Sequence, residues 1–213
     1  MQPNNNKKLI RSIMMVFVAV FTISITAAIP SSAQVDDRAR GFYLGLKFIG
    51  SSLHVDDDGD NSFFVKDDGG GVQLHAGYSF NRVFSLELSL GGANHETSVQ
   101  AIDANFGLVQ LFAHYRFRPG RAFRPYIKGG FGGYTLELSD NKASVRVEGG
   151  GIPIGGGFDY FFSKHFSLGV DFTHNIINYN KLAIDLGDGA TAGFDMDEEG
   201  AMTSLGLALA FYF

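Results

Sequence analysis

The last nine residues, Leu205-Gly206-Leu207-Ala208-Leu209-Ala210-Phe211-Tyr212-Phe213, alternate between large apolar side chains and mostly small ones. A period of two is typical of a β-strand with two different faces. In a soluble barrel the bulky face points inward, whereas in a membrane barrel it meets lipid and the small residues face a narrow interior. Because the pattern runs to a final aromatic residue, a membrane barrel is the favoured interpretation.

The same alternation recurs upstream in seven further segments, separated by turn-like or acidic stretches. The eight predicted strands are 41–53, 71–81, 84–96, 102–117, 123–138, 147–162, 166–179 and 201–213. Their connections are short at 81–83, 118–122 and 163–165, and longer loops are expected at 55–70, 97–101, 139–146 and 180–200. Short turns at one end and longer loops at the other are typical of the periplasmic and extracellular ends of such barrels. The predicted fold class is therefore all-β, an eight-stranded antiparallel transmembrane β-barrel with both termini in the periplasm.

The N-terminus carries a different pattern. Lys7, Lys8 and Arg11 precede an apolar run at 13–29, and a stretch of small residues ends at Ala33. This order is typical of a signal peptide that is cleaved after Ala33. An uncleaved membrane anchor is the alternative, but the run is at the short edge of the about 20 residues that a spanning helix needs. The expected domains are a signal peptide at 1–33 and an outer-membrane barrel at 34–213.

Composition excludes several classes of protein. The chain has 213 residues and no cysteine, so neither disulfides nor a lipid-modified cysteine is possible. Beyond residue 33 there are 14 Lys and Arg against 22 Asp and Glu, a net charge of −8. Nucleic acid is therefore not an expected partner, because phosphate contacts require a basic face. The same part of the chain holds no apolar run near 18 residues, so it would have to cross a membrane with strands.

With these features the chain resembles the OmpA-like family of small, porin-like outer-membrane β-barrel proteins. The resemblance covers essentially the whole mature chain and rests on the architecture and the terminal strand. It implies a Gram-negative cell surface, with outer-membrane lipids and lipopolysaccharide around the barrel and the barrel-assembly machinery as a partner. The bulky residues of the last strand look like the family's assembly signal: Leu205, Leu207, Leu209, Phe211 and Phe213.

If the bulky positions face lipid, the residues between them face the interior. Those predicted inward positions include Gln73, His75 and three acids and three bases, which form a predicted lumen charge network: Lys47, Glu87, Arg116, Lys128, Asp159 and Asp171. Unpaired buried charge is costly, and eight strands enclose a space only just wide enough for side chains. A structural network of ion pairs is therefore favoured. A gated ion path, in which the pairs exchange partners, is the alternative.

No enzyme, metal or cofactor motif is complete. The acidic stretch at 56–61 imitates part of a calcium loop, but counting from Asp56 places Asp67, not Glu, at the twelfth position. Lipid A deacylases place a Ser two residues from a His, whereas His174 here is followed by Ile176. The glycine clusters at 129–133, 149–151 and 155–157 lack the context of a phosphate-binding loop, and we interpret them as structural. We expect no catalytic, metal-binding or cofactor-binding residue and no prosthetic group.

Two classes of function remain open. The first is a structural and surface-interaction protein that supports outer-membrane integrity and presents acidic extracellular loops, including 185–199, to host molecules or lipopolysaccharide. Loops on a rigid scaffold are where binding usually resides. The second is a narrow porin-like channel for ions or small solutes, which the expected width of the barrel disfavours.

Overall fold

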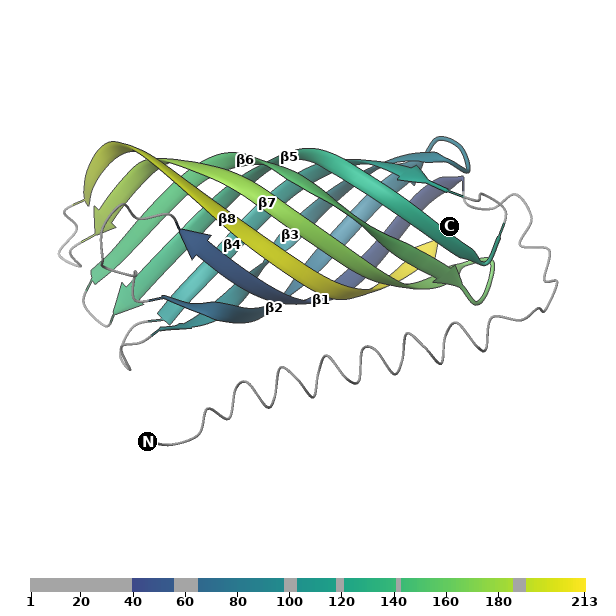
Figure 1. The fold of residues 1–213 in the computed structure, drawn as a ribbon, viewed down its shortest axis with the longest axis horizontal. Helices are drawn as coiled ribbons and strands as arrows, with labels where there is room; N and C mark the ends of the chain where they lie inside the picture. The colour runs from purple at the N-terminus through teal and green to yellow at the C-terminus, as the bar shows by residue number, and fades with distance from the viewer. Residues whose placement is uncertain (1–39, 56–64, 98–102, 118–120, 141–142, 186–190) are drawn as a thin grey trace, which may run out of the picture. The chain divides into compact units, whose positions relative to one another are not determined.

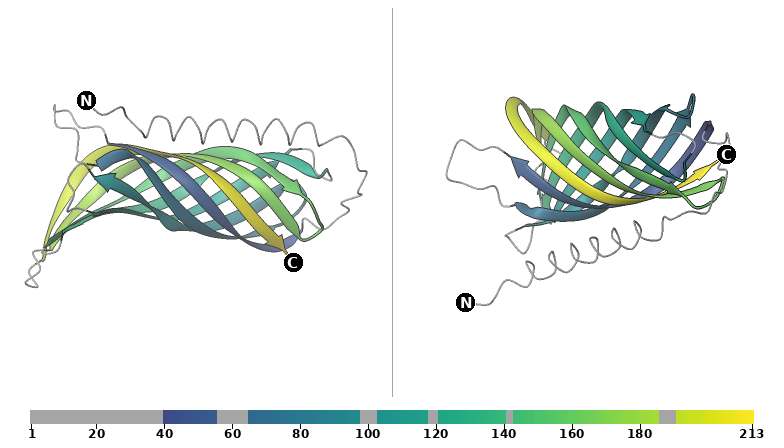
Figure 2. Two further views of the ribbon diagram at one scale, coloured as in Figure 1. Left: turned by 90° about the horizontal axis from the view of Figure 1, so that it is seen from below. Right: turned by 45° about the vertical axis from the view of Figure 1, so that its right-hand side comes forward.

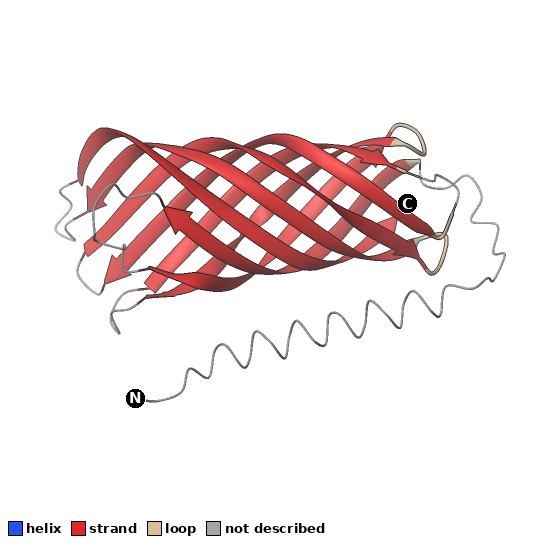
Figure 3. Cartoon of the chain, viewed as in Figure 1, coloured by secondary structure: helices blue, strands red, loops and turns tan. Residues whose placement is uncertain are grey.

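The computed structural model describes residues 40–55, 65–97, 103–117, 121–140, 143–185 and 191–213. Within these ranges no helix has the length and hydrophobicity needed to span a membrane. The regular elements of these described ranges are eight β-strands (Figure 3). They are β1 (Gly41–Val55), β2 (Val65–Ser79), β3 (Phe84–Thr97), β4 (Asp103–Arg116), β5 (Phe123–Asp140), β6 (Ala143–Phe161), β7 (Phe166–Asp185) and β8 (Thr191–Tyr212).

Each strand pairs antiparallel with the next one in sequence, and β8 pairs antiparallel with β1, which closes the barrel (Figure 1). Closure leaves none of the membrane-spanning backbone groups at an open sheet edge, the condition that a strand must meet in lipid. The predicted eight-stranded antiparallel barrel is confirmed.

The strand register sets the tilt of the strands. Each residue can be followed to its pairing partner on the next strand, and a path that begins at Gly45 of β1 arrives at Gly200 of β8. Gly200 pairs with Val55 of β1, which lies ten residues beyond Gly45. A stagger of this size makes the strands cross the barrel axis obliquely, as Figure 2 shows. Residues far apart in the sequence thereby reach the same level of the interior.

The two faces of each strand differ as the sequence predicted. In β1, the outward residues Phe42, Leu44 and Phe48 are each more than half exposed, whereas the inward Tyr43 and Lys47 are buried. The same alternation runs through β2 and β7. A continuous apolar outer surface would be a liability in water, but it is the surface that lipid requires. The predicted orientation of the strands is confirmed.

The tight turns lie at the end of the barrel where the chain finishes (Figure 1). Asn81 Oδ1 accepts hydrogen bonds from the backbone N–H groups of Val83 and Phe84, both at 2.8 Å. Exposed aromatic side chains gather near this end, as in the aromatic girdle of a membrane interface. They are Phe42, Tyr78, Phe80, Phe84, Tyr115, Phe117, Phe123, Tyr160, Phe162, Phe166 and Phe213.

At the opposite end the strands are longer than predicted. Residues 180–200 were expected as a loop, but β7 continues to Asp185, β8 begins at Thr191, and Lys181 pairs with Asp195. Most of 139–146 likewise belongs to β5 and β6, and β2 begins within 55–70. The prediction of long loops was wrong here, because backbone pairing continues beyond the membrane, where an apolar face is no longer required. The acids at 195–199 therefore lie on a strand.

Candidate functional site

Among the described residues, two interior carboxylates each gather several donors, and the first is Asp171 of β7. Its Oδ1 accepts hydrogen bonds from Lys128 Nζ at 2.8 Å and Thr173 Oγ1 at 3.0 Å. Its Oδ2 accepts one from the Tyr126 hydroxyl at 2.6 Å. The Lys128 ammonium also lies 4.1 Å from the centre of the Phe112 ring. Asp171 is therefore held by groups from two strands, and most of its hydrogen-bonding capacity is used.

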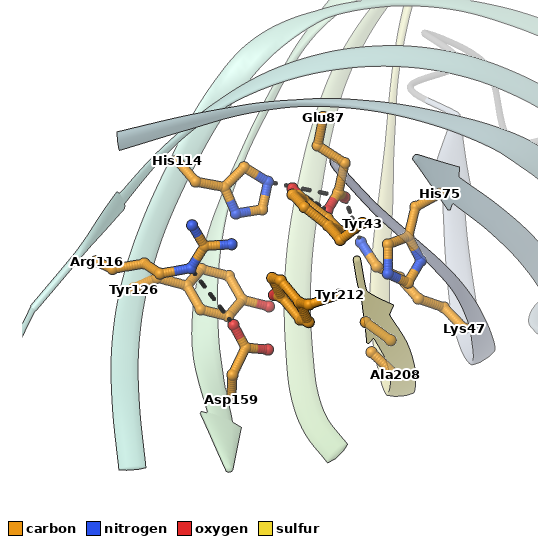
Figure 4. Close-up of a pocket in the computed structure, with 11 residues that line it drawn as sticks. Tyr43, Lys47, His75, Glu87, His114, Arg116, Tyr126, Asp159, Ala208 and Tyr212 are labelled. Atoms are coloured by element: carbon orange, nitrogen blue, oxygen red, sulfur yellow. Dashed lines mark hydrogen bonds and ion pairs between the residues drawn. The ribbon is translucent and has the colours of Figure 1, made fainter. Parts of the chain in front are cut away.

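Glu87 of β3 is the second of these carboxylates (Figure 4). Its Oε1 accepts a hydrogen bond from Lys47 Nζ at 2.8 Å, and its Oε2 accepts one from the Tyr43 hydroxyl at 3.1 Å. His114 places Nε2 3.7 Å from Glu87 Oε1. Lys47 Nζ also lies 3.8 Å from Asp171 Oδ2, so this lysine joins the two carboxylates.

Arg116 of β4 forms the third part of the network, nearer the tight turns. Its Nε lies 3.6 Å from Asp159 Oδ2, and its Nη1 donates to Ser85 Oγ at 2.8 Å and Ser79 Oγ at 3.4 Å. The structure thus places all six predicted charges in the interior and brings each of them within ion-pair distance of an opposite charge.

Several interior residues were missed by the sequence reasoning. Tyr43 and Tyr126 donate to the acids, and His114 lies beside Glu87. Arg124 is 2% exposed, stacks over the Phe161 ring at 4.1 Å and donates from Nε to a backbone carbonyl oxygen. All four lie at inward-facing positions of their strands. Counting every second residue of each strand, with tyrosine, histidine and the arginine near the turn included, would therefore have found them.

Glycine in β6 makes room for this network. A Cβ added at Gly157 would lie 2.9 Å from the Tyr126 hydroxyl oxygen, which is the group that donates to Asp171. The same added atom would collide with the backbone carbonyl oxygen of Val170. Gly157 therefore permits both the close approach of β7 and the position of Tyr126.

The free space inside the charged half is small. Tyr43, Lys47, Glu87, Arg116 and other interior residues line a cavity of about 20 Å³ (Figure 4). A single water needs about 10 to 15 Å³ of such volume, so the cavity has room for one water molecule. The charged half is packed with side chains.

The other half of the interior contains a buried apolar cluster, which the sequence analysis did not predict. An amide layer separates the halves: Gln110 Nε2 donates to Asn175 Oδ1 at 2.6 Å, and the Tyr134 hydroxyl donates to the same oxygen at 3.0 Å. Beyond it lies a buried cluster that we call the apolar plug. Its members are Phe106, Leu108, Tyr134, Leu136, Ile177, Tyr179 and Met202.

Other predicted sites fall elsewhere. Leu205, Leu207 and Leu209 face outward, Phe211 is half-buried and Phe213 is 70% exposed. His174 is partly buried on the outer face, with Nδ1 2.9 Å from Thr203 Oγ1. The acidic stretch at 56–61 lies outside the described residues.

A closed antiparallel barrel with an apolar outer face, an aromatic girdle and a charged interior defines the class of transmembrane barrels of outer membranes. The chain belongs to the outer membrane protein beta-barrel domain family, whose model matches residues 19–210. The predicted outer-membrane location and the resemblance to small outer-membrane barrels are confirmed. Among curated proteins there is no significant match.

Three solved structures are similar to this chain. Neisserial surface protein A is 14% identical over 81% of this chain and 97% of its own, with a TM-score of 0.59. OprG from Pseudomonas aeruginosa is 17% identical over 84% and 98%, with a TM-score of 0.56. Ail of Yersinia pestis is 16% identical over 82% and 99%, with a TM-score of 0.52. At these identities the similarity shows a common fold.

Proposed function

We propose that this protein is a closed structural barrel that supports the outer membrane and presents its outer hairpins as an interaction surface. The observation that carries the proposal is the packed interior. Buried ion pairs occupy one half, the apolar plug lies in the other, and the cavity among the charges holds about 20 Å³. A fixed set of paired charges stabilises the barrel, whereas an open path needs continuous water-filled space.

The proposal includes the route to the membrane. Residues 1–33 act as a signal peptide that is removed, and 34–213 form the mature barrel. The outward positions of β8, from Leu205 to Phe213, act as the recognition signal for the barrel-assembly machinery. Their exposure supports this role, because Leu205, Leu207 and Leu209 remain accessible when the strand pairs.

The outer hairpin of β7 and β8 is the proposed interaction surface. It carries exposed Asp195, Asp197, Glu198 and Glu199, together with Phe194, which is 55% exposed. Such a surface attracts cationic patches on host molecules, or lipopolysaccharide phosphates through divalent cations. Ail has been solved with the heparin analogue sucrose octasulfate. The acidic hairpin of this chain repels polyanions, so a ligand of that kind is not expected at this surface.

The proposed role involves no catalysis. His174 contacts Thr203, and Ile176 occupies the place where a deacylase would carry its serine. The alternative function is a narrow channel. The buried charges favour it, because they offer ions polar contacts through half of the barrel, but the apolar plug opposes it.

Removal of the hairpin tests the interaction role. Replacing residues 181–196 with an Asn-Gly turn and changing Asp197, Glu198 and Glu199 to the corresponding amides should abolish binding of cells to host-cell surfaces. Assembly should stay intact, because the paired membrane segments are retained. Binding is measured by adhesion of an expressing strain, and assembly by heat-modifiable gel mobility. A variant with Asp195, Asp197, Glu198 and Glu199 changed to the corresponding amides keeps the hairpin as a control for shape. Unchanged adhesion of the hairpin-deleted strain would contradict the proposed role.

A further inference from the structure

The outer surface changes character at one level on four neighbouring strands, β3 to β6. Moving away from the tight turns, the last large apolar side chain on each strand is followed by an outward glycine and then by a polar residue. The series are Leu90, Gly92, Asn94; Val109, Gly107, Asn105; Phe131, Gly133, Thr135; and Ile152, Gly150, Glu148. This level is the boundary between the lipid-facing band and the polar outer end of the barrel.

The barrel itself does not require three of these glycines. A Cβ added at Gly107 or Gly150 would meet its nearest atom at 3.9 or 3.8 Å, and one added at Gly133 would meet nothing within 4 Å. None of the three has a backbone conformation that favours glycine. Their lack of side chains therefore leaves open space on the outer surface.

Around Gly107 and Gly133 this open space belongs to a groove of about 670 Å³. Gly92, Gly107, Gly133 and Gly149 line it, and Val109 lies at its apolar margin. Its polar side chains are Asn94, Asn105, Thr135, Glu137, Arg146 and Glu148. The volume is within the range of about 300 to 1,000 Å³ that is typical of small-molecule sites.

Arg146 supplies the only described cation in this groove. Its guanidinium lies 3.9 Å from Glu137 and 3.8 Å from Glu148, beyond hydrogen-bond distance, and the side chain is about half exposed. The two carboxylates hold the guanidinium at the groove while its N–H donors stay available. An arginine in this position is suited to a phosphate group.

We propose that the groove binds the phosphorylated sugar headgroup of a glycolipid in the outer leaflet. Its level at the edge of the apolar band fits a lipid headgroup, with the acyl chains lying below against Val109 and Phe131. Arg146 donates to the phosphate. The amides of Asn94 and Asn105 and the carboxylates of Glu137 and Glu148 have the donors and acceptors that sugar hydroxyls need. This site lies on the outer wall and does not depend on whether the lumen conducts.

The groove can be filled without disturbing the barrel. Gly133→Leu places a side chain in open space, and Gly50→Leu is the matched control. Gly50 is an outward glycine of β1 that does not line the groove, and its added Cβ would be 4.0 Å from the nearest atom. Arg146→Gln removes the charge alone. Gel mobility before and after heating confirms that each variant is folded.

The test uses protein purified from outer membranes, mixed with lipid A in mild detergent and examined by native mass spectrometry. One lipid A should remain bound, with binding unchanged by Gly50→Leu. Gly133→Leu and Arg146→Gln should each weaken it about tenfold or more, the effect of losing one charge-assisted hydrogen bond or its equivalent. Equal binding by wild type and Gly133→Leu would overturn the proposal. Equal retention of phosphatidylglycerol would also overturn it, because the site would then recognise phosphate alone. A barrel dimer that Gly133→Leu abolishes would overturn it as well, because the groove would then be a contact between two copies of the chain.

Discussion

Asp171→Asn is expected to lower the free energy of unfolding by about 3 to 5 kcal/mol, the cost of breaking a buried ion pair by removing one partner. Asparagine keeps the size of the side chain but removes the negative charge that faces Lys128 at 2.8 Å. The Lys128 side chain is 1% exposed, so water cannot take over the role of the carboxylate. Lys47 loses its second acid as well.

Urea unfolding of the refolded barrel in detergent micelles measures this loss. Adding Lys128→Met to Asp171→Asn removes the unpaired ammonium and should recover most of the stability. Asp195→Asn changes an exposed acid on β8 and should shift the free energy by less than about 0.5 kcal/mol. A loss below about 1 kcal/mol for Asp171→Asn, the size of an exposed pair, would contradict a structural role for the network.

Phe213→Ala is expected to remove most of the protein from the outer membrane while leaving refolding in detergent unchanged. The Phe213 side chain is 70% exposed, so its loss removes little packing, and the backbone bond from Phe213 N to Phe42 O is retained. An assembly defect without a folding defect would therefore come from lost recognition of the terminal strand.

Membrane fractionation and heat-modifiable mobility measure assembly in cells, and refolding yield measures intrinsic folding. Phe162→Ala is the matched control, because Phe162 is a 57% exposed aromatic residue near the same end of the barrel. Equal outer-membrane levels for both variants would mean that Phe213 is not part of an assembly signal.

The fold could be predicted because the bilayer imposes a strict rule on each spanning strand. In β8, Leu205, Leu207 and Leu209 must face lipid, so period-two alternation marks the strand. The rule ends at the membrane boundary, which is why 180–200 was mistaken for a loop. Lys181 and Asp195 still pair as strand residues, but no apolar face marks them.

The sequence predicted which charged residues lie in the interior, but not which of them form ion pairs with each other. Lys47 and Glu87 were expected inside because they alternate with lipid-facing residues. Their contact joins residues 40 positions apart and depends on the stagger of the barrel. The apolar plug was missed because Phe106 and Leu108 share a strand with outward Val109 and Leu111, so inward and outward faces look alike there. The groove could not be predicted, because the sequence does not show the open space around Gly133.

Single-channel recording of the refolded barrel, residues 34–213, in a planar bilayer is the most direct test of the closed interior. The packed charges and the apolar plug predict a silent bilayer, with folding verified by heat-modifiable mobility. Reproducible, ion-selective current steps that change with Glu87→Gln or Lys128→Met would contradict the closed barrel and favour a narrow channel.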